Sequence, residues 1–527
     1  MATPGKRDKT GGHAVLVAAG ILLSRLVGLV RQRVFSHYFG LSDAADAFNQ
    51  AFRIPNLLQN LLGEGVLSAS LIPVYSKLLA EGDEEEAGKV AGAIGTILAL
   101  VISILVLLGV LSTPILIDLI APGFKGAKRE LTITLVRILF PGAGLFALSA
   151  WCLGILNSHR KFFLSYAAPV IWNVAMIVTL LLFGRLDLGD LAVKLAWGSV
   201  VGSALQFGFQ LPFVRILVPR LKFRVASHSA HVREVARTFV PVFFSKGVAQ
   251  ISAYVDAWLA SWLGRSAVSG LTNAQTLYML PVSIFGMSIS AAELPAMSSA
   301  TGDPEQVAGY LRGRLDLGLR RVAFYVVPSA VAFLALGDVI AGVLFQTGRF
   351  GRGDSLYVWG ILAGSSVGLL ASTMGRLYSS AYYALRDTRT PLRYAALRIA
   401  LTTALGYLCS MPLPHLLALE PKWGVAGLTA SAGIAGWLEF FLLRRAMNAR
   451  IGKTGAPPAL IARLWASALL AAGCGWVIKS LLAGRNPLLI GACALIPYGL
   501  VYVGMTLVFR ISEASSTFRA LLRSRRG

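Results

Sequence analysis

The chain alternates between long apolar stretches and short polar segments, and this pattern predicts its secondary structure. A helix of about 20 mostly apolar residues is long enough to cross the hydrocarbon core of a bilayer. By that measure 14 spans are predicted, at 14–35, 46–78, 90–113, 131–157, 164–184, 190–214, 235–263, 267–298, 318–345, 355–385, 393–412, 423–445, 458–482 and 487–510. The pattern is typical of an all-α integral membrane protein.

A short internal repeat groups these helices. The sequence LSYAA at 164–168 recurs as LRYAA at 392–396, each time after a short basic turn. The same offset carries the first predicted helix onto the seventh. We therefore expect two pseudo-symmetric six-helix lobes plus two C-terminal helices, with a site between the lobes near mid-membrane. The predicted segments are a cytoplasmic N-terminus (1–13), an N-lobe (14–218), a C-lobe (219–447), a C-terminal helix pair (448–510) and a cytoplasmic basic tail (511–527).

Composition and charge agree with a membrane protein. Of the 527 residues, 56% are hydrophobic and 14% are charged, whereas soluble proteins carry about a quarter charged residues. In a soluble chain a net charge of +24 would favour nucleic acid as a partner. Here roughly three times as many Lys and Arg lie in loops on the side of the N-terminus as on the other side. We expect both termini in the cytoplasm and no nucleic-acid partner.

Several classes of enzyme are disfavoured by the sequence. The four cysteines, Cys152, Cys409, Cys474 and Cys493, lie in apolar segments without metal-ligand spacing. No P-loop and no H-E-x-x-H motif occur, and the polar stretches are too short for a catalytic domain. We therefore expect no enzyme activity: no catalytic residues, no metal site and no cofactor.

Charged residues interrupt the first two predicted helices at helical spacing. A charge on an isolated helix at the bilayer centre costs about 2.5–3.5 kcal/mol, so such residues normally face water or each other. Two interpretations stay open: ion pairs or snorkelling to headgroups that only hold the helices, and a hydrated cationic pocket for an anionic ligand. The candidate binding residues are Arg25, Arg31, Asp46, Asn49, Arg53, Asn56 and Glu64.

The second half of the chain carries a similar polar stripe along 267–298. In the preceding helix, Lys246 and Asp256 are equally compatible with an interhelical ion pair and with a pocket, and the role of Arg376 in the tenth helix is also open. The candidates from this half are Lys246, Gln250, Asp256, Thr276, Glu293 and Arg376.

The motifs SRLVGLVRQRVFSHYFG, ADAFNQAFRIPNLL, GEGVLSASLIPVY, LFQTGRFGRGDS and YYALRDTRTPLRYA occur in this order along the chain. Together they resemble the MurJ (MviN) lipid II flippases of the MOP exporter superfamily. The resemblance implies a bacterial inner-membrane protein with a central cationic cavity. It would move undecaprenyl-diphosphate-linked disaccharide-pentapeptide, lipid II, to the periplasmic leaflet by alternating access. By motif match, the essential charged positions fall on Arg25, Arg31, Asp46 and Glu64.

The chain departs from the family pattern at Gln32, Gln59 and Thr276, where neutral residues replace charged ones. A flippase for another undecaprenyl-linked oligosaccharide and a non-transporting cell-wall scaffold therefore stay as alternatives. Expected partners are lipid II, membrane lipid and cell-wall synthesis proteins. For energy, coupling to the membrane potential or to a monovalent cation is expected.

Overall fold

The computed structural model of the chain describes residues 7–62, 64–219, 221, 229–300 and 302–515. Every regular element in these ranges is helical. Ten of the described helices are long and apolar enough to cross a membrane, and eleven if the bent pair Arg352–Ser366 and Leu369–Ala384 forms one span. The all-α membrane fold is confirmed, while the count of 14 helices stays a prediction.

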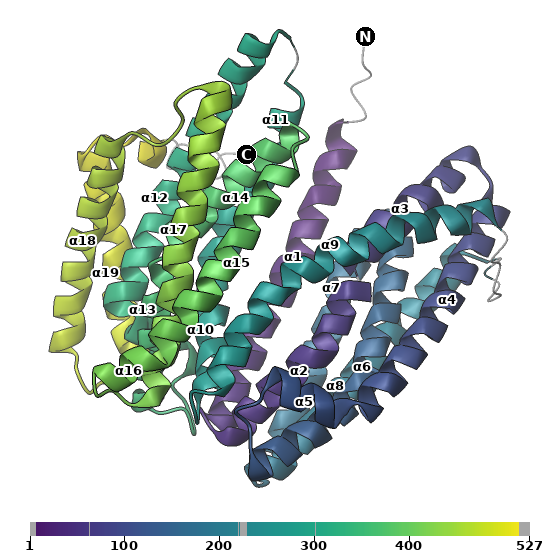
Figure 1. The fold of residues 1–527 in the computed structure, drawn as a ribbon, viewed down its shortest axis with the longest axis horizontal. Coiled ribbons are helices and arrows are strands. Elements are labelled where there is room, and N and C mark those ends of the chain that lie inside the picture. The colour runs from purple at the N-terminus through teal and green to yellow at the C-terminus, as the bar shows by residue number, and fades with distance from the viewer. Residues whose placement is uncertain (1–6, 63, 220, 222–228, 301, 516–527) are drawn as a thin grey trace. The chain divides into compact units, whose positions relative to one another are not determined.

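The chain divides into two compact units, Met1–Trp262 with Thr347–Arg349, and Leu263–Gln346 with Phe350–Gly527. The helices of the first unit are α1 (Arg7–Phe39), α2 (Asp43–Leu62), α3 (Glu64–Glu81), α4 (Glu84–Leu111), α5 (Thr113–Ile120), α6 (Gly126–Ser158), α7 (Phe162–Phe183), α8 (Leu188–Leu217) and α9 (Ala230–Ser261) (Figure 1). This unit includes α9, which the repeat assigns to the C-lobe. The lobe boundary between residues 218 and 219 stays a prediction.

Helix α6 is the centre of the first unit, because it packs against α2, α3, α4 and α8. Its buried face is rich in small residues, among them Gly142, Ala143, Ala147 and Ala150. Small side chains let helix backbones approach closely inside a membrane. Around this centre, α1 packs against α7, and α9 packs against α2 and α3.

The second unit contains α10 (Ala267–Pro281), η2 (Val282–Met287), α11 (Ser288–Ser298), α12 (Pro304–Phe345), α13 (Arg352–Ser366), α14 (Leu369–Ala384), α15 (Arg389–Ser410), α16 (Pro412–Leu416), η3 (Pro421–Trp423), α17 (Gly424–Ile451), α18 (Pro458–Leu481) and α19 (Pro487–Val508). Helix α17 packs against α13, α14 and α15, while α18 and α19 pack against each other and against α12. The element η2 is a π-helix that follows Pro281. Proline removes a backbone donor, so the regular hydrogen-bond ladder changes at this point.

Helix α17 and the residue that precedes α14 approach closely at two glycines. A Cβ on Gly433 would lie 2.6 Å from the backbone nitrogen of Gly368, closer than packed atoms can approach. The absence of side chains at both positions therefore allows the two backbones to touch.

The turn after α6 recurs after α14. Arg160 and Arg386, each two residues beyond the helix end, have positive φ angles of 60° and 58°. In both turns the next residue donates its N–H to a carbonyl five positions earlier, from Lys161 to Leu156 and from Asp387 to Tyr382. This is the Schellman pattern of helix ends. The two basic turns of the sequence repeat thus share one backbone conformation.

Candidate functional site

Arg31 on α1 is held by α7 of the same unit. Its Nε donates a hydrogen bond of 2.9 Å to Oδ1 of Asn173. Its guanidinium carbon lies 5.1 Å from the centroid of the Trp172 ring, within the range of a cation–π interaction. The side-chain Nδ2 of Asn173 donates to the carbonyl of Pro169 at 2.9 Å, which fixes the orientation of the accepting oxygen. One of the five N–H donors of Arg31 is therefore used to position the group.

Trp172 is the centre of an aromatic wall beside Arg31. Its ring stacks on Phe52 of α2 with centroids 5.6 Å apart and meets Phe146 of α6 edge-on at 5.5 Å. The indole Nε1 donates to Oγ of Ser199 on α8 at 3.0 Å. Because Trp172 is fixed from three further helices, Arg31 lies over a rigid surface.

A small cavity lies against the same wall. It encloses about 10 Å³, close to the space that one water molecule needs. The lining residues are Phe52, Pro55, Asn56, Gln59, Leu139, Gly142, Ala143, Phe146 and Ser199. The structure thus places the predicted Asn56 in a partly polar cavity, together with Gln59, one of the neutral residues at which the chain departs from the family pattern.

Arg53 on α2 interacts with α9. Tyr254 donates its hydroxyl to the backbone carbonyl of Arg53 at 2.6 Å. The guanidinium of Arg53 lies within electrostatic range of the Asp256 carboxylate, and their opposite charges attract. Two predicted candidates, Arg53 and Asp256, are therefore brought together although about 200 residues separate them in the chain.

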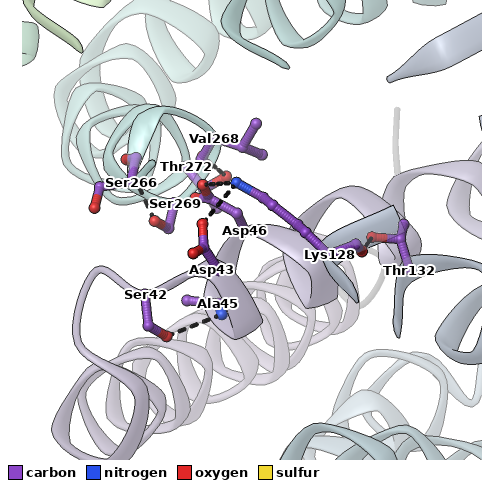
Figure 2. A network of polar contacts seen from close by, with 10 residues as sticks. All are labelled: Ser42, Asp43, Ala45, Asp46, Lys128, Thr132, Ser266, Val268, Ser269 and Thr272. Atoms are coloured by element: carbon purple, nitrogen blue, oxygen red, sulfur yellow. Dashed lines mark hydrogen bonds and ion pairs between the residues drawn. The ribbon is translucent and has the colours of Figure 1, made fainter. Parts of the chain in front are cut away.

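Asp46 is completely buried near the start of α2, where it forms an ion pair with Lys128 in the first turn of α6. Lys128 Nζ lies 2.6 Å from Oδ2 of Asp46 and 3.2 Å from Oδ1 of Asp43, as Figure 2 shows. The ammonium also lies 4.3 Å from the centroid of the Phe124 ring. The hydropathy pattern gives no signal for Lys128, because this residue lies outside the predicted spans.

The remaining first-unit candidates are less constrained. Arg25 is exposed on α1, six residues before Arg31. Asn49 is half-buried, and its Nδ2 has no hydrogen-bond partner among the described residues. The side chains of Glu64, Lys246 and Gln250 lie outside the described part of the structure.

In the second unit, the predicted candidates lie in three different environments. Thr276 donates its hydroxyl to the carbonyl of Thr272 on its own helix at 2.9 Å. Glu293 is 2% exposed and forms ion pairs with two residues of α12, Arg314 at 2.7 Å and Arg321 at 3.5 Å. Arg376 is exposed on α14. The site assignments of all three stay predictions.

Several residues of these clusters escaped the sequence analysis. Asn173 and Trp172 are uncharged residues of an apolar span, so hydropathy gives no signal for them. Arg398 and Glu439 did carry a signal, since each is a charge inside a predicted span, and they form an ion pair of 3.3 Å. No group of three or more metal-ligating side chains occurs within the described residues.

Comparison with protein families and curated proteins finds one consistent relationship. The family model for the lipid II flippase MurJ matches residues 35–496. The lipid II flippase MurJ of Burkholderia cenocepacia is 31% identical over 438 residues, which cover 82% of each chain. A probable lipid II flippase MurJ of Haemophilus influenzae is 31% identical over 444 residues, which cover 81% of this chain and 84% of the relative.

Solved structures show a similar fold. A lipid II flippase MurJ in an inward closed conformation superposes with a TM-score of 0.78 at 24% identity, over 94% of this chain and 98% of the other. A multidrug resistance MATE family transporter of the MOP superfamily, in an inward-facing conformation, superposes with a TM-score of 0.66 at 19% identity, over 83% of this chain and 98% of the other. At these identities the likeness concerns the fold alone.

Proposed function

Because the chain belongs to the lipid II flippase MurJ family, we propose that it moves lipid II across the inner membrane. It is a transporter and not an enzyme, and it is a multi-pass inner-membrane protein of peptidoglycan synthesis. It carries the undecaprenyl-diphosphate-linked peptidoglycan precursor from the cytoplasmic to the periplasmic leaflet by alternating access between two conformations.

The observation that carries the site proposal is the position of Arg31. It lies in the C-terminal half of a spanning helix, held by Asn173 over the face of Trp172. A guanidinium binds phosphate oxygens through paired N–H donors. This interaction becomes stronger where water is excluded. In our proposal Arg31 binds the diphosphate of lipid II, and the exposed Arg25 on the same helix assists it.

We further propose that 14 helices cross the membrane with both termini in the cytoplasm. Helices α1, α2 with α3, and α9 also carry predicted spans, and adding them to the eleven apolar spans gives the predicted number. Reporter fusions at each terminus test the orientation. A periplasmic signal from either fusion would contradict it.

For the energy source we propose the membrane potential, which acts on a moving charge with about 2.3 kcal/mol per 100 mV. Translocation in sealed vesicles should fall when the potential is dissipated at constant ion composition. Dependence on a monovalent cation in the absence of a potential would contradict this assignment. Membrane lipid and cell-wall synthesis proteins stay proposed partners.

The decisive experiment replaces the flippase of a depleted bacterium with this chain. Lipid II should become accessible on the periplasmic face with the wild type, and accessibility should be lost with Arg31→Ala and with Arg25→Ala at equal membrane levels. Arg485→Ala, which removes an exposed arginine of a loop in the second unit, serves as the matched control and should retain activity. Retention by both α1 variants would overturn the assignment of the diphosphate to these arginines.

A further inference from the structure

Three charged side chains lie near the middle of three packed helices in the second unit. Arg398 of α15 pairs with Glu439 of α17, with Nε and Oε2 3.3 Å apart. Arg376 of α14 lies within electrostatic range of the same carboxylate. Arg398 and Glu439 are 34% and 16% exposed, so the pair is largely shielded by the surrounding helices. The cluster therefore holds two positive charges and one negative charge within apolar spans.

The packing of α14 against α17 brings Arg376 to the level of Glu439. Tyr378, two residues after Arg376, meets the ring of Phe440 edge-on at 5.6 Å. Further along, Tyr382 donates its hydroxyl to the carbonyl of Leu443 at 3.0 Å. The two helices thus run side by side in the same direction, and this level of the cluster is fixed by contacts on α14 and α17 themselves.

Two hydroxyl groups complete the polar cluster. The hydroxyl of Tyr278 on α10 lies 2.8 Å from Oγ of Ser372 on α14, and Ser372 donates its own hydroxyl to the carbonyl of Leu369 at 3.1 Å. Ser372 lies one helical turn before Arg376, and residues four apart share a helix face. Tyr278 is also within electrostatic range of both Arg376 and Arg398. Two guanidinium groups and two hydroxyl groups from three helices therefore gather beside one carboxylate.

The cluster carries an excess positive charge, which favours the binding of an anion. An ionisable residue at mid-span is costly unless it is paired or solvated. Glu439 neutralises one arginine, and the second arginine leaves an excess positive charge. A guanidinium is suited to an oxyanion, either a carboxylate or a phosphate.

We propose that Arg376 binds a carboxylate of the peptide stem of the transported lipid, while Glu439 and Arg398 position Arg376. This inference rests on the proposed function, in which the chain transports lipid II. The anionic groups of that substrate besides its diphosphate are the carboxylates of its pentapeptide. The cluster would then select lipids that carry the peptide over undecaprenyl-linked sugars that lack it.

The test compares two lipids on the purified full-length protein in nanodiscs. One is lipid II, and the other is its undecaprenyl-diphosphate-linked disaccharide without the peptide. Arg376→Gln should weaken the binding of lipid II by about tenfold, the loss expected for one hydrogen bond to a charged group, and leave binding of the peptide-free lipid unchanged. Arg485→Gln, the matched change of an exposed arginine in the same unit, should alter neither affinity.

Three further variants separate the positioning of Arg376 from ligand binding, and this inference from the proposed function. Glu439→Asp keeps the carboxylate beside Arg398 and Arg376 and should preserve selectivity, whereas Glu439→Gln should reduce it. Arg31→Gln should weaken the binding of both lipids. If Arg376→Gln weakens the binding of both lipids equally, or of neither, this inference alone is overturned. A wild-type protein that binds neither lipid would overturn the proposed function together with it.

Discussion

The Nε of Arg31 donates to Oδ1 of Asn173 across 2.9 Å, joining α1 to α7 through one arginine and one neutral amide. The amide is itself fixed by its donation to the carbonyl of Pro169. A charged group in an apolar span therefore has a defined position before any substrate arrives. Preorganised donors of this kind bind an anion with less loss of conformational freedom than mobile ones.

The first prediction concerns Asn173. Asn173→Ala should reduce the appearance of periplasmic lipid II by up to about tenfold in the depleted strain, because Arg31 loses the acceptor that positions it. Asn173→Asp keeps an acceptor but adds a carboxylate that competes with the diphosphate for Arg31, so activity should fall as well.

If Asn173 acts through Arg31, the two effects are not additive. In an Arg31→Ala background, Asn173→Ala should therefore reduce the appearance of periplasmic lipid II little further. If the activity loss of the double variant equals the product of the two single losses, Asn173 does not act by positioning Arg31.

The second prediction concerns the buried pair of Asp46 and Lys128. Lys128→Met leaves the completely buried Asp46 carboxylate without this partner, and breaking such a pair costs about 3–5 kcal/mol. Thermal unfolding of the purified protein should therefore begin at a clearly lower temperature. The double variant Asp46→Asn with Lys128→Met removes both charges and should recover most of the stability.

For the Asp46 pair, lipid II binding by the folded protein is the second readout. If Asp46 only anchors α2 to α6, the double variant should bind lipid II as the wild type does. Lost binding in a stable double variant would instead support a direct contact between Asp46 and the substrate.

The third prediction concerns the close approach between α17 and the residue that precedes α14. Gly433→Val places a Cβ 2.6 Å from the nitrogen and 3.1 Å from the Cα of Gly368, so the backbones must separate. Overpacking of this kind costs typically about 1–3 kcal/mol, and a lower unfolding temperature is expected. Gly436→Val on the same helix is the matched control, because its Cβ would meet nothing within 4 Å. Equal destabilisation by the two variants would show that the close approach is unimportant.

The fourth prediction concerns pH and the turn between α14 and α15. The backbone N–H and hydroxyl of Thr390 donate to Asp387, Arg450 pairs with it at 2.7 Å, and together they lower the pKa of Asp387 from 3.8 to about 2. Because the pKa is lower in the folded protein, the stabilisation is present above about pH 4 and is lost as the pH falls towards 2.

The measurement for Asp387 is the unfolding temperature as a function of pH. Asp387→Asn should be less stable than the wild type at neutral pH, and the difference should shrink between pH 4 and pH 2. A constant difference across this range would contradict the assigned role of the carboxylate.

Local pattern was sufficient to locate many of the helices. The predicted spans 458–482 and 487–510 correspond closely to α18 (Pro458–Leu481) and α19 (Pro487–Val508). Burial of apolar side chains depends on composition within a segment, so the hydropathy of a stretch predicts a spanning helix without knowledge of its neighbours. The irregular π-helical step at Val282–Met287 did not follow from hydropathy, because it concerns the hydrogen bonds of the backbone.

By itself the sequence determined the class of protein, the family resemblance and the concentration of charge in the first two helices. Only the tertiary structure decided which side chains meet: Arg31 with Asn173, Asp46 with Lys128, and Arg53 with Asp256. Helical periodicity places a residue on a face of its own helix, whereas its partner is set by which helices pack together and at what level. A charge in an apolar span indicates that a partner or water lies nearby, and the packing of the helices determines which residue that partner is.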